Sequence, residues 1–403
     1  MSKRSRKESR GDEPERSHSV GKGPNTSKRP CLSRCSPSLA ESDMSNQPCL
    51  PPEQKRRRRQ HLYLVVDDWE GGYSVHRVAE EAFVSDSDAG GLDTCPALSP
   101  LVRIEARQPF SLSFAAHGTK ILAMRPSLFS PGVPVFDTET LGMTVCPYPP
   151  GGVPLGINRP VYATAGGKLL SFDEYNLNVL APPTEESWAW TCVEQDPPFV
   201  SSLASGYAVH PDGRTVFVSA DGWSPYAGRV THSLLKTRKS TFAFDMERLE
   251  WTHVGEWLLP FRGRGFYDGE LGAWVGLCRS EEGGAGRVCC CYVPPAAAAG
   301  CEAAMPAWKL GQDVFFDADR EGGHWGATLA YMGDSRFCVV ESRVPTDCSL
   351  DPSTRLLKMT SFVLKYDRHG DLRTTRRRAY ASASYRVAHG EIDLVRNPVA
   401  FWM

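Results

Sequence analysis

The chain has 403 residues, which leaves room for one large folded unit or two smaller ones. Its 46 Lys and Arg residues nearly balance 47 Asp and Glu residues, but the first sixty positions hold 15 of the basic and 7 of the acidic residues, leaving 31 and 40 for the rest. This distribution argues against a nucleic-acid-binding surface in the residues after position 60, because a phosphate-binding surface needs an excess of cations. Any nucleic-acid contact would belong to the basic N-terminal segment.

Two classes of protein are disfavoured by the residue pattern. No stretch approaches the roughly 20 consecutive apolar residues that a membrane-spanning helix needs, and the start lacks the apolar core of a secretory signal. We therefore expect a soluble protein of the nucleus, the cytoplasm or both. The 13 cysteines are an odd number without framework spacing, so they are predicted to be reduced thiols in the core.

Residues 1–60 are predicted to form a disordered basic tail, because they contain too few apolar side chains to offset the entropy of ordering. A run of cations at the end of this tail suits the acidic groove of a nuclear import receptor. Contact with nucleic acid or an acidic partner, and a merely solubilising tail, are the alternatives. The cations of this run are Lys55, Arg56, Arg57, Arg58 and Arg59.

The composition changes at His61, where an apolar run begins, and residues 61–403 are predicted to form one all-β domain. Short runs rich in Val, Phe, Tyr and Thr end at Gly, Pro or Asp, as strands do. Convincing amphipathic helices are missing, and 36 glycines and 31 prolines leave little room for a long one. Examples of these strands are Lys120 to Met124, Lys168 to Phe172, Thr215 to Ser219, Arg336 to Glu341 and Thr360 to Tyr366.

A loose internal repeat favours a β-propeller of about six or seven irregular blades. An apolar strand ends in an aromatic residue and Asp, a few turn residues follow, and a second strand begins. In such a hairpin the Asp accepts hydrogen bonds from turn amides. We expect the ring to close by pairing Leu62–Val66 with the C-terminal residues, which removes exposed sheet edges. The repeat occurs at Phe136-Asp137, Phe172-Asp173, Phe244-Asp245 and Tyr366-Asp367.

Candidate chemical sites are sparse, and each has a structural explanation that we prefer. Cys289-Cys290-Cys291 cannot share one metal ion, because successive strand side chains point to opposite faces. Asp67-Asp68-Trp69 is typical of a turn at a strand end. The densest polar cluster is interpreted as a solvated loop, since nothing in its spacing orients a base toward a nucleophile. It comprises Asp317, Asp319, Arg320, Glu321 and His324, flanked by Phe315-Phe316 and Trp325.

The segment Asp221 to Ser240 is a candidate partner-binding loop. Aromatic and cationic side chains project from it between two expected strands, and such groups dominate binding hot spots. An unconstrained insertion is the alternative. The binding residues that we would assign are Trp223, Tyr226, Arg229 and His232.

Several ordered motifs after residue 61 resemble a plant family, expanded in grasses, that is known as domain of unknown function 1668. The resemblance implies a kelch-like propeller behind a short basic leader, without a catalytic residue or cofactor to carry over. True kelch repeats end the second strand of a blade with Gly-Gly, whereas Gly166-Gly167 precedes its strand here. The motifs are Leu62 to Trp69, Tyr207 to Thr215, Gly255 to Phe261, Ala273 to Leu277 and Tyr331 to Cys338.

We therefore expect a non-catalytic interaction module, a scaffold or adaptor that binds a protein partner and needs no metal or cofactor. The alternative is a hydrolase or oxidase that acts on a carbohydrate or small metabolite at the propeller face. The ten histidines occur singly, which disfavours a copper oxidase. Paired carboxylates of a glycosidase could come from distant blades, so sequence spacing leaves this alternative open.

Overall fold

The computed structural model describes residues 59–403 except 84–98, 109, 151–159, 174–175, 182–187, 196, 200, 224–235, 296–302, 319–322, 346–350, 352, 380–382 and 389–396. The chain separates into two units, Met1–Arg57 and Arg58–Met403, and the description below concerns the second unit. Within the described residues no helix is long and apolar enough to cross a membrane. The predicted cationic run, apart from Arg59, lies outside these residues.

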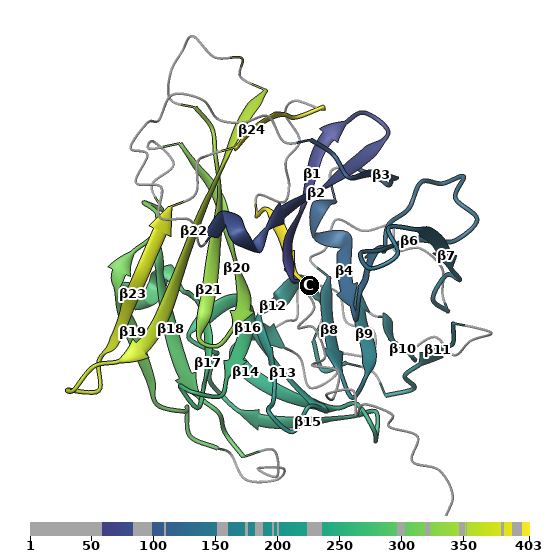
Figure 1. Ribbon diagram of the computed structural model, residues 1–403. Coiled ribbons are helices and arrows are strands. Elements are labelled where there is room, and N and C mark those ends of the chain that lie inside the picture. Colours follow the sequence, from purple (N-terminus) through teal and green to yellow (C-terminus); the bar gives the residue numbers. More distant parts are fainter. Residues whose placement is uncertain are drawn as a thin grey trace, which may run out of the picture. The chain divides into compact units, whose positions relative to one another are not determined.

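The described residues form strands joined by turns and single-turn 3-10 helices (Figure 1). The strands of the first half are β1 (His61–Trp69), β2 (Gly72–Ala79), β3 (Val102–Glu105), β4 (Phe114–His117), β5 (Lys120–Ala123), β6 (Val133–Asp137), β7 (Met143–Cys146), β8 (Val161–Ala165), β9 (Lys168–Asp173), β10 (Asn176–Leu180), β11 (Trp190–Cys192) and β12 (Ala204–Val209).

The second half continues the same pattern. Its strands are β13 (Thr215–Trp223), β14 (Lys236–Asp245), β15 (Glu250–Gly255), β16 (Phe261–Asp268), β17 (Ala273–Cys278), β18 (Arg287–Tyr292), β19 (Trp308–Val314), β20 (His324–Gly333), β21 (Arg336–Arg343), β22 (Thr354–Tyr366), β23 (Leu372–Ala379), β24 (Ala383–Arg386) and β25 (Val399–Trp402). The 3-10 helices are η1 (Glu80–Phe83), η2 (Ser111–Ser113), η3 (Ser201–Leu203) and η5 (Ser280–Glu282).

These strands make six antiparallel blades, which confirms the all-β propeller. Blade I is ordered β25-β1-β2-β3, blade II β4 to β7 and blade III β11 to β8. Blades IV (β12 to β15) and V (β16 to β19) join into one eight-stranded sheet, and blade VI contains β20 to β23 with β24 paired to β22. Blade number was predicted only as six or seven, because insertions of uneven length separate the strands.

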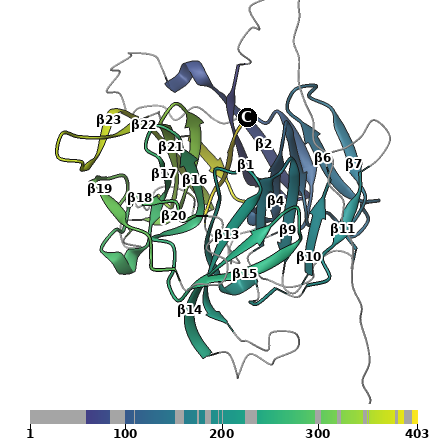
Figure 2. The ribbon, with the colours of Figure 1, turned by 90° about the horizontal axis from the view of Figure 1, so that it is seen from below.

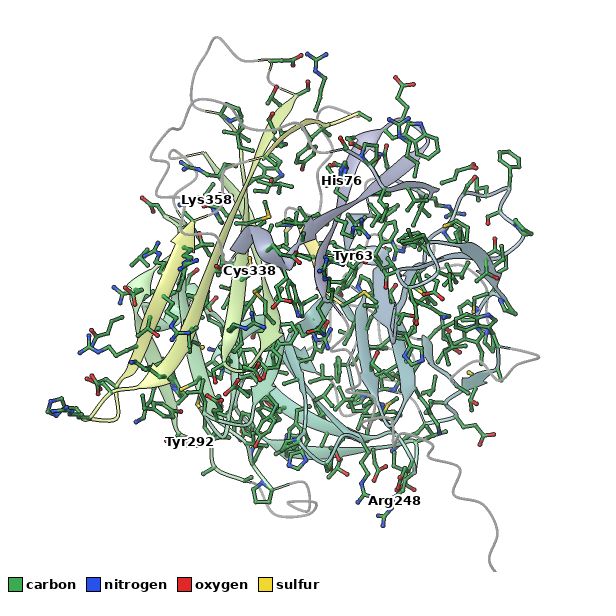
Figure 3. The ribbon with its side chains drawn as sticks, viewed as in Figure 1. Tyr63, His76, Arg248, Tyr292, Cys338 and Lys358 are labelled. Atoms are coloured by element: carbon green, nitrogen blue, oxygen red, sulfur yellow. The ribbon has the colours of Figure 1, made fainter. Side chains whose placement is uncertain are left out.

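Six apolar cores connect each blade to the next in a closed cycle, from I to II, II to III and onward until VI meets I. Both faces of a blade are therefore buried, which explains the continuous apolar runs in the sequence. In β1, Leu62 and Leu64 face blade VI, whereas Tyr63 and Val65 face blade II. Figure 3 labels Tyr63 and Cys338, which lie in two different cores of this cycle.

The ring closes as predicted, by pairing of the two ends of the domain in blade I. Strand β25 runs antiparallel to β1, with Leu62 opposite Trp402 and Val65 opposite Val399. The amide of His61 donates to the carbonyl of Met403 at 2.7 Å, which extends the ladder past the strand. Strand β1 therefore has partners on both sides, and its apolar residues present no free edge.

Blades IV and V approach closely because glycine faces glycine at their junction. Strands β12 and β16 pair in parallel, with Gly206 opposite Gly263. A Cβ on Gly206 would lie 2.6 Å from the carbonyl oxygen of Phe261, so a larger residue would push the strands apart. The parallel junction was not predicted, because glycine in a strand indicates close approach without naming the partner.

The repeated aromatic-Asp motif has the predicted role in three of its four occurrences. Asp137 and Asp245 end the third strand of a blade, and Asp367 directly follows one. All three accept hydrogen bonds from turn amides at 2.8 to 3.1 Å. Asp173 ends the second strand of blade III instead, and its side chain lies outside the described residues. Gly166 and Gly167, both at positive φ, form the first turn of that blade.

Candidate interaction surface

Most residues of the predicted import and partner-binding sites lie outside the described part of the chain. Arg59 is exposed, and its guanidinium lies 3.8 Å from the carboxylate of Glu81, which is also exposed, so the pair has little energetic consequence. Trp223 ends β13 and pairs with Lys236 of β14. Tyr226, Arg229 and His232 fall within the undescribed residues 224–235. Both sites therefore stay predictions.

The three consecutive cysteines are buried strand residues, as expected. Cys289 and Cys291 face the core between blades IV and V, whereas Cys290 faces the core between blades V and VI. Burial raises the pKa of all three thiols, and that of Cys291 reaches about 12. They are therefore protonated and unreactive at neutral pH.

The prediction of a turn at Asp67-Asp68-Trp69 is wrong, because these are the last three residues of β1, and Asp68 contacts a buried imidazole there. The Oδ2 of Asp68 lies 3.3 Å from Nε2 of His76, which comes from the adjacent strand β2. Burial would raise the pKa of Asp68, but hydrogen bonds from His76 and Ser74 outweigh burial and lower it. The pair fixes the β1–β2 hairpin, in agreement with a structural role.

The polar cluster around His324 is only partly the one that the sequence indicated. Asp319, Arg320 and Glu321 lie outside the described residues, and His324 begins β20. Its ring stacks on Phe316, with centroids 4.6 Å apart, and its Nδ1 lies 3.1 Å from Oε1 of Glu341.

Glu341 had not been identified as a partner of His324, because only the register of β20 and β21 brings these distant positions together. The pair could move a proton, but its setting favours structure over catalysis. Oε1 of Glu341 also lies 3.8 Å from Nε of Arg343, so this buried carboxylate is held between two groups. The next hydroxyl along the strand, that of Ser342, is directed to the opposite face by strand alternation. A Ser-His-Glu relay is thus ruled out for these three residues.

Among the described residues, no group of three or more His, Cys, Asp or Glu side chains could hold a metal ion.

A buried acidic cluster that sequence reasoning missed links blades V and VI. Asp268, at the end of β16, accepts hydrogen bonds from the amide of Leu271 and the hydroxyl of Ser335, both at 2.9 Å. Burial, followed by the negative charge of Asp268, raises the pKa of Tyr331 to about 12. The carboxylate thus joins the β16–β17 turn to the β20–β21 turn of the next blade.

Replacing Asp268 with Ala is expected to destabilise the domain by about 2–3 kcal/mol, because the buried amide of Leu271 loses its acceptor and the hydroxyl of Ser335 loses the nearer of its two acceptors. Urea denaturation followed by tryptophan fluorescence would measure this loss. The comparison is Glu270→Ala on the same turn. This exposed carboxylate also accepts from the hydroxyl of Ser335, at 3.1 Å, but Asp268 still binds that hydroxyl in the variant, so the loss should be under about 1 kcal/mol. Equal effects of the two substitutions would show that the buried carboxylate does not link the blades.

Exposed large apolar side chains gather on blade II. Eight such residues occur in the described part of the chain, and five belong to this blade. Phe129 and Leu128, in the β5–β6 connection, are 93% and 74% exposed. Leu141, Met143 and Val145, in and before β7, are 48%, 49% and 45% exposed. We call these five residues the blade II surface.

The two parts of the blade II surface are held side by side. The phenol of Tyr148, just after β7, donates to the carbonyl of Ser130 in the β5–β6 connection at 2.6 Å. A Cβ on Gly132 would lie 2.7 Å from Cγ1 of Val145, so the connection contacts the end of β7 directly. The exposed Leu128 and Phe129 therefore belong to a segment packed beside the C-terminal end of β7.

The sequence profile of a family described as protein of unknown function, DUF1668, matches residues 59–382. The chain belongs to this family. In the DUF1668 chain the match spans every blade, from β1 to the end of β23.

A comparison of this DUF1668 chain with curated proteins gives no match. Among solved structures it is similar to a chain of the nidogen/laminin complex, with 11% identity, a TM-score of 0.39, and coverage of 81% of this chain and 98% of that one. A Pseudomonas aeruginosa periplasmic gluconolactonase matches with 10% identity, a TM-score of 0.37 and coverage of 82% and 100%. These likenesses carry no argument about activity.

Proposed function

We propose that the domain is a non-catalytic protein-interaction module and that a protein partner contacts the blade II surface. The observation that carries the proposal is the concentration of exposed apolar side chains on one blade of six. Contiguous exposed apolar side chains are typical of interaction sites on soluble proteins. Phe129, which is almost fully exposed, is the anchor that we would assign to the contact.

The frame beneath this surface is rigid, which favours binding. Blade II packs on blade I through Phe114, Ile121 and Phe136, and on blade III through Leu122 and Val135. A surface held by two buried cores loses little conformational entropy when a partner docks. The blade therefore holds the backbone that carries these apolar side chains in a fixed position.

The alternative, a hydrolase or oxidase, would have His324 and Glu341 as its acid-base pair. We do not favour it, because stacking on Phe316 and the proximity of Arg343 occupy both groups within blade VI. Nuclear import through Lys55–Arg59 stays a prediction, and so does a second contact through the segment Asp221–Ser240, in which Trp223 ends β13. Neither conflicts with a scaffold that binds through blade II.

Changing Leu128 and Phe129 together to Ser should remove partner binding without unfolding the domain. A single apolar anchor at the centre of an interface contributes about 2 kcal/mol or more, so even if only one of the two residues is an anchor, capture of a bound partner should fall at least about 30-fold. Quantitative affinity purification from cells that express the protein would measure this change. The matched control replaces Met305 and Val314, exposed apolar residues outside blade II, with Ser.

The control variant should retain the partners that the wild-type protein captures. Both variants should unfold at the wild-type temperature, because none of the four side chains is buried. Recovery of the same partners at the same level by the Leu128 and Phe129 variant would overturn the proposal.

A further inference from the structure

We propose that the blade II surface binds a second copy of this chain, through antiparallel pairing of β7 with β7 of the partner copy. This inference rests on the proposed function and specifies the partner. In Figures 1 and 2 strand β7 lies at the outer edge of its blade, and among the described strands it pairs only with β6. Its other edge is the one that the proposal uses.

The register of β6 and β7 shows which backbone groups this edge presents. The amide of Asp137 donates to the carbonyl of Gly142 at 2.9 Å, so these two residues form a hydrogen-bonded pair. Hydrogen-bonded and non-hydrogen-bonded pairs alternate in an antiparallel ladder. Met143 and Val145, opposite Phe136 and Pro134, are therefore in non-hydrogen-bonded pairs. Their N–H and C=O groups point away from β6.

Strand β7 has four residues, one more than β11, but it lacks the charged side chains that protect the other outer strands from pairing. Folded proteins protect sheet edges with charged side chains or by keeping the strands very short. The outer strands β3, β15, β19 and β23 all contain charged residues, and β11 has only three residues. Strand β7 reads Met-Thr-Val-Cys, and the five residues from Leu141 to Val145 are all exposed. As far as the described residues go, it is an open and uncharged edge.

The edge is complementary to itself about a two-fold axis. With Thr144 opposite Thr144 of the second copy, Met143 lies opposite Val145 and Val145 opposite Met143. Each of these pairs exchanges two hydrogen bonds, because both residues direct their backbone groups outward. Each also places one apolar side chain against another, a favourable cross-strand contact. The same patch serves on both copies, as a two-fold interface requires.

The exposed area is sufficient for such an interface. The five side chains of the blade II surface expose on the order of 500 Å² of apolar area. Two copies would together bury about 1,000 Å², to which the strand backbones add, and this reaches the lower bound for a specific interface. Antiparallel pairing also places Leu141 of the second copy at the C-terminal end of β7. The segment that carries Phe129 packs beside that same end. The apolar side chains at both ends are then covered.

A cysteine placed on the two-fold axis tests the register directly. In the full chain, Thr144→Cys should give a disulfide-linked dimer, because Cα atoms of a non-hydrogen-bonded pair lie about 4.5 Å apart, within the range of a disulfide. The matched control is Met143→Cys. Its two copies would be about 8–9 Å apart, beyond disulfide reach.

Under mild oxidation the dimer should form at least about tenfold faster with Thr144→Cys than with Met143→Cys. Non-reducing electrophoresis would measure the rates, and mass spectrometry of the linked peptide would identify the bond. Equal rates for the two variants would overturn the proposed register. The natural cysteines, which both variants share, provide a common background.

Analytical ultracentrifugation of the unmodified protein supplies the independent test. The wild-type chain should be a dimer at micromolar concentration, and Val145→Lys should make it monomeric by placing like charges on the paired edges. Met305→Lys, which adds the same charge outside blade II, should leave the dimer intact. A wild-type monomer would overturn the second-copy proposal.

The outcomes also separate this inference from the proposed function. A monomer whose capture of another protein still depends on Leu128 and Phe129 would leave the interaction module standing without self-association. If Val145→Lys also abolishes that capture, a strand of the other protein occupies β7 instead. A monomer whose captured partners are unaffected by all these changes would overturn both proposals.

Discussion

A chain that ends at residue 398 is expected to lose the folded domain. It lacks β25, so the hydrogen bonds between β25 and β1 disappear and the apolar residues of β1 form a free edge. Val399, Phe401 and Trp402 also leave the cores that join blade I to blades II and VI. The combined loss is on the order of 5 kcal/mol or more, comparable with the total stability of a typical domain.

Thermal denaturation with light scattering would measure the effect as an absent or strongly lowered transition and early aggregation. The comparison is Arg248→Ala, which changes an exposed turn of blade IV (Figure 3) and should leave the transition unchanged. A truncated chain that unfolds at the wild-type temperature would mean that β25 does not close the ring. A peptide spanning the missing strand, added in excess, should partly restore the transition by mass action.

The sequence predicted this closure because an apolar strand at the end of an open sheet would leave an exposed edge. A strand such as Leu62–Val66 must be covered on two sides, and in a propeller the cover comes from neighbouring blades. The turns were predictable for a local reason. Asp137, Asp245 and Asp367 bond to amides within four residues, so the sequence nearby specifies the interaction.

Contacts between strands of one blade, and contacts between blades, were not predictable, because they depend on register and not on proximity in the chain. His324 meets Glu341 only through the pairing of β20 with β21, and Asp268 meets Ser335 of the next blade. Neither pair has a spacing that signals chemistry. The blade II surface was missed for a related reason: a short apolar run such as Met143–Cys146 has the composition of a buried strand, and only its place at a blade edge exposes it.

Among single substitutions, we expect Trp274→Ala to cause the largest loss of stability. It should lower the free energy of unfolding by about 3–5 kcal/mol. Trp274 is fully buried in β17, and its ring centroid lies 5.2 Å from that of Phe217 in blade IV. Its indole Nε1 donates to the carbonyl of Val209 at 2.7 Å. Removing the ring opens a cavity between blades IV and V and leaves that carbonyl without this donor.

Trp274→Phe separates these two contributions. A phenyl ring keeps most of the packing against Phe217 but cannot donate to Val209, so it should cost about 1–1.5 kcal/mol. Denaturant unfolding of both variants gives the two free energies. The double variant with Phe217→Ala should lose less than the sum of the single losses, because the two rings share one contact. Strict additivity, or equal losses for Trp274→Ala and Trp274→Phe, would show that this ring does not join the two blades.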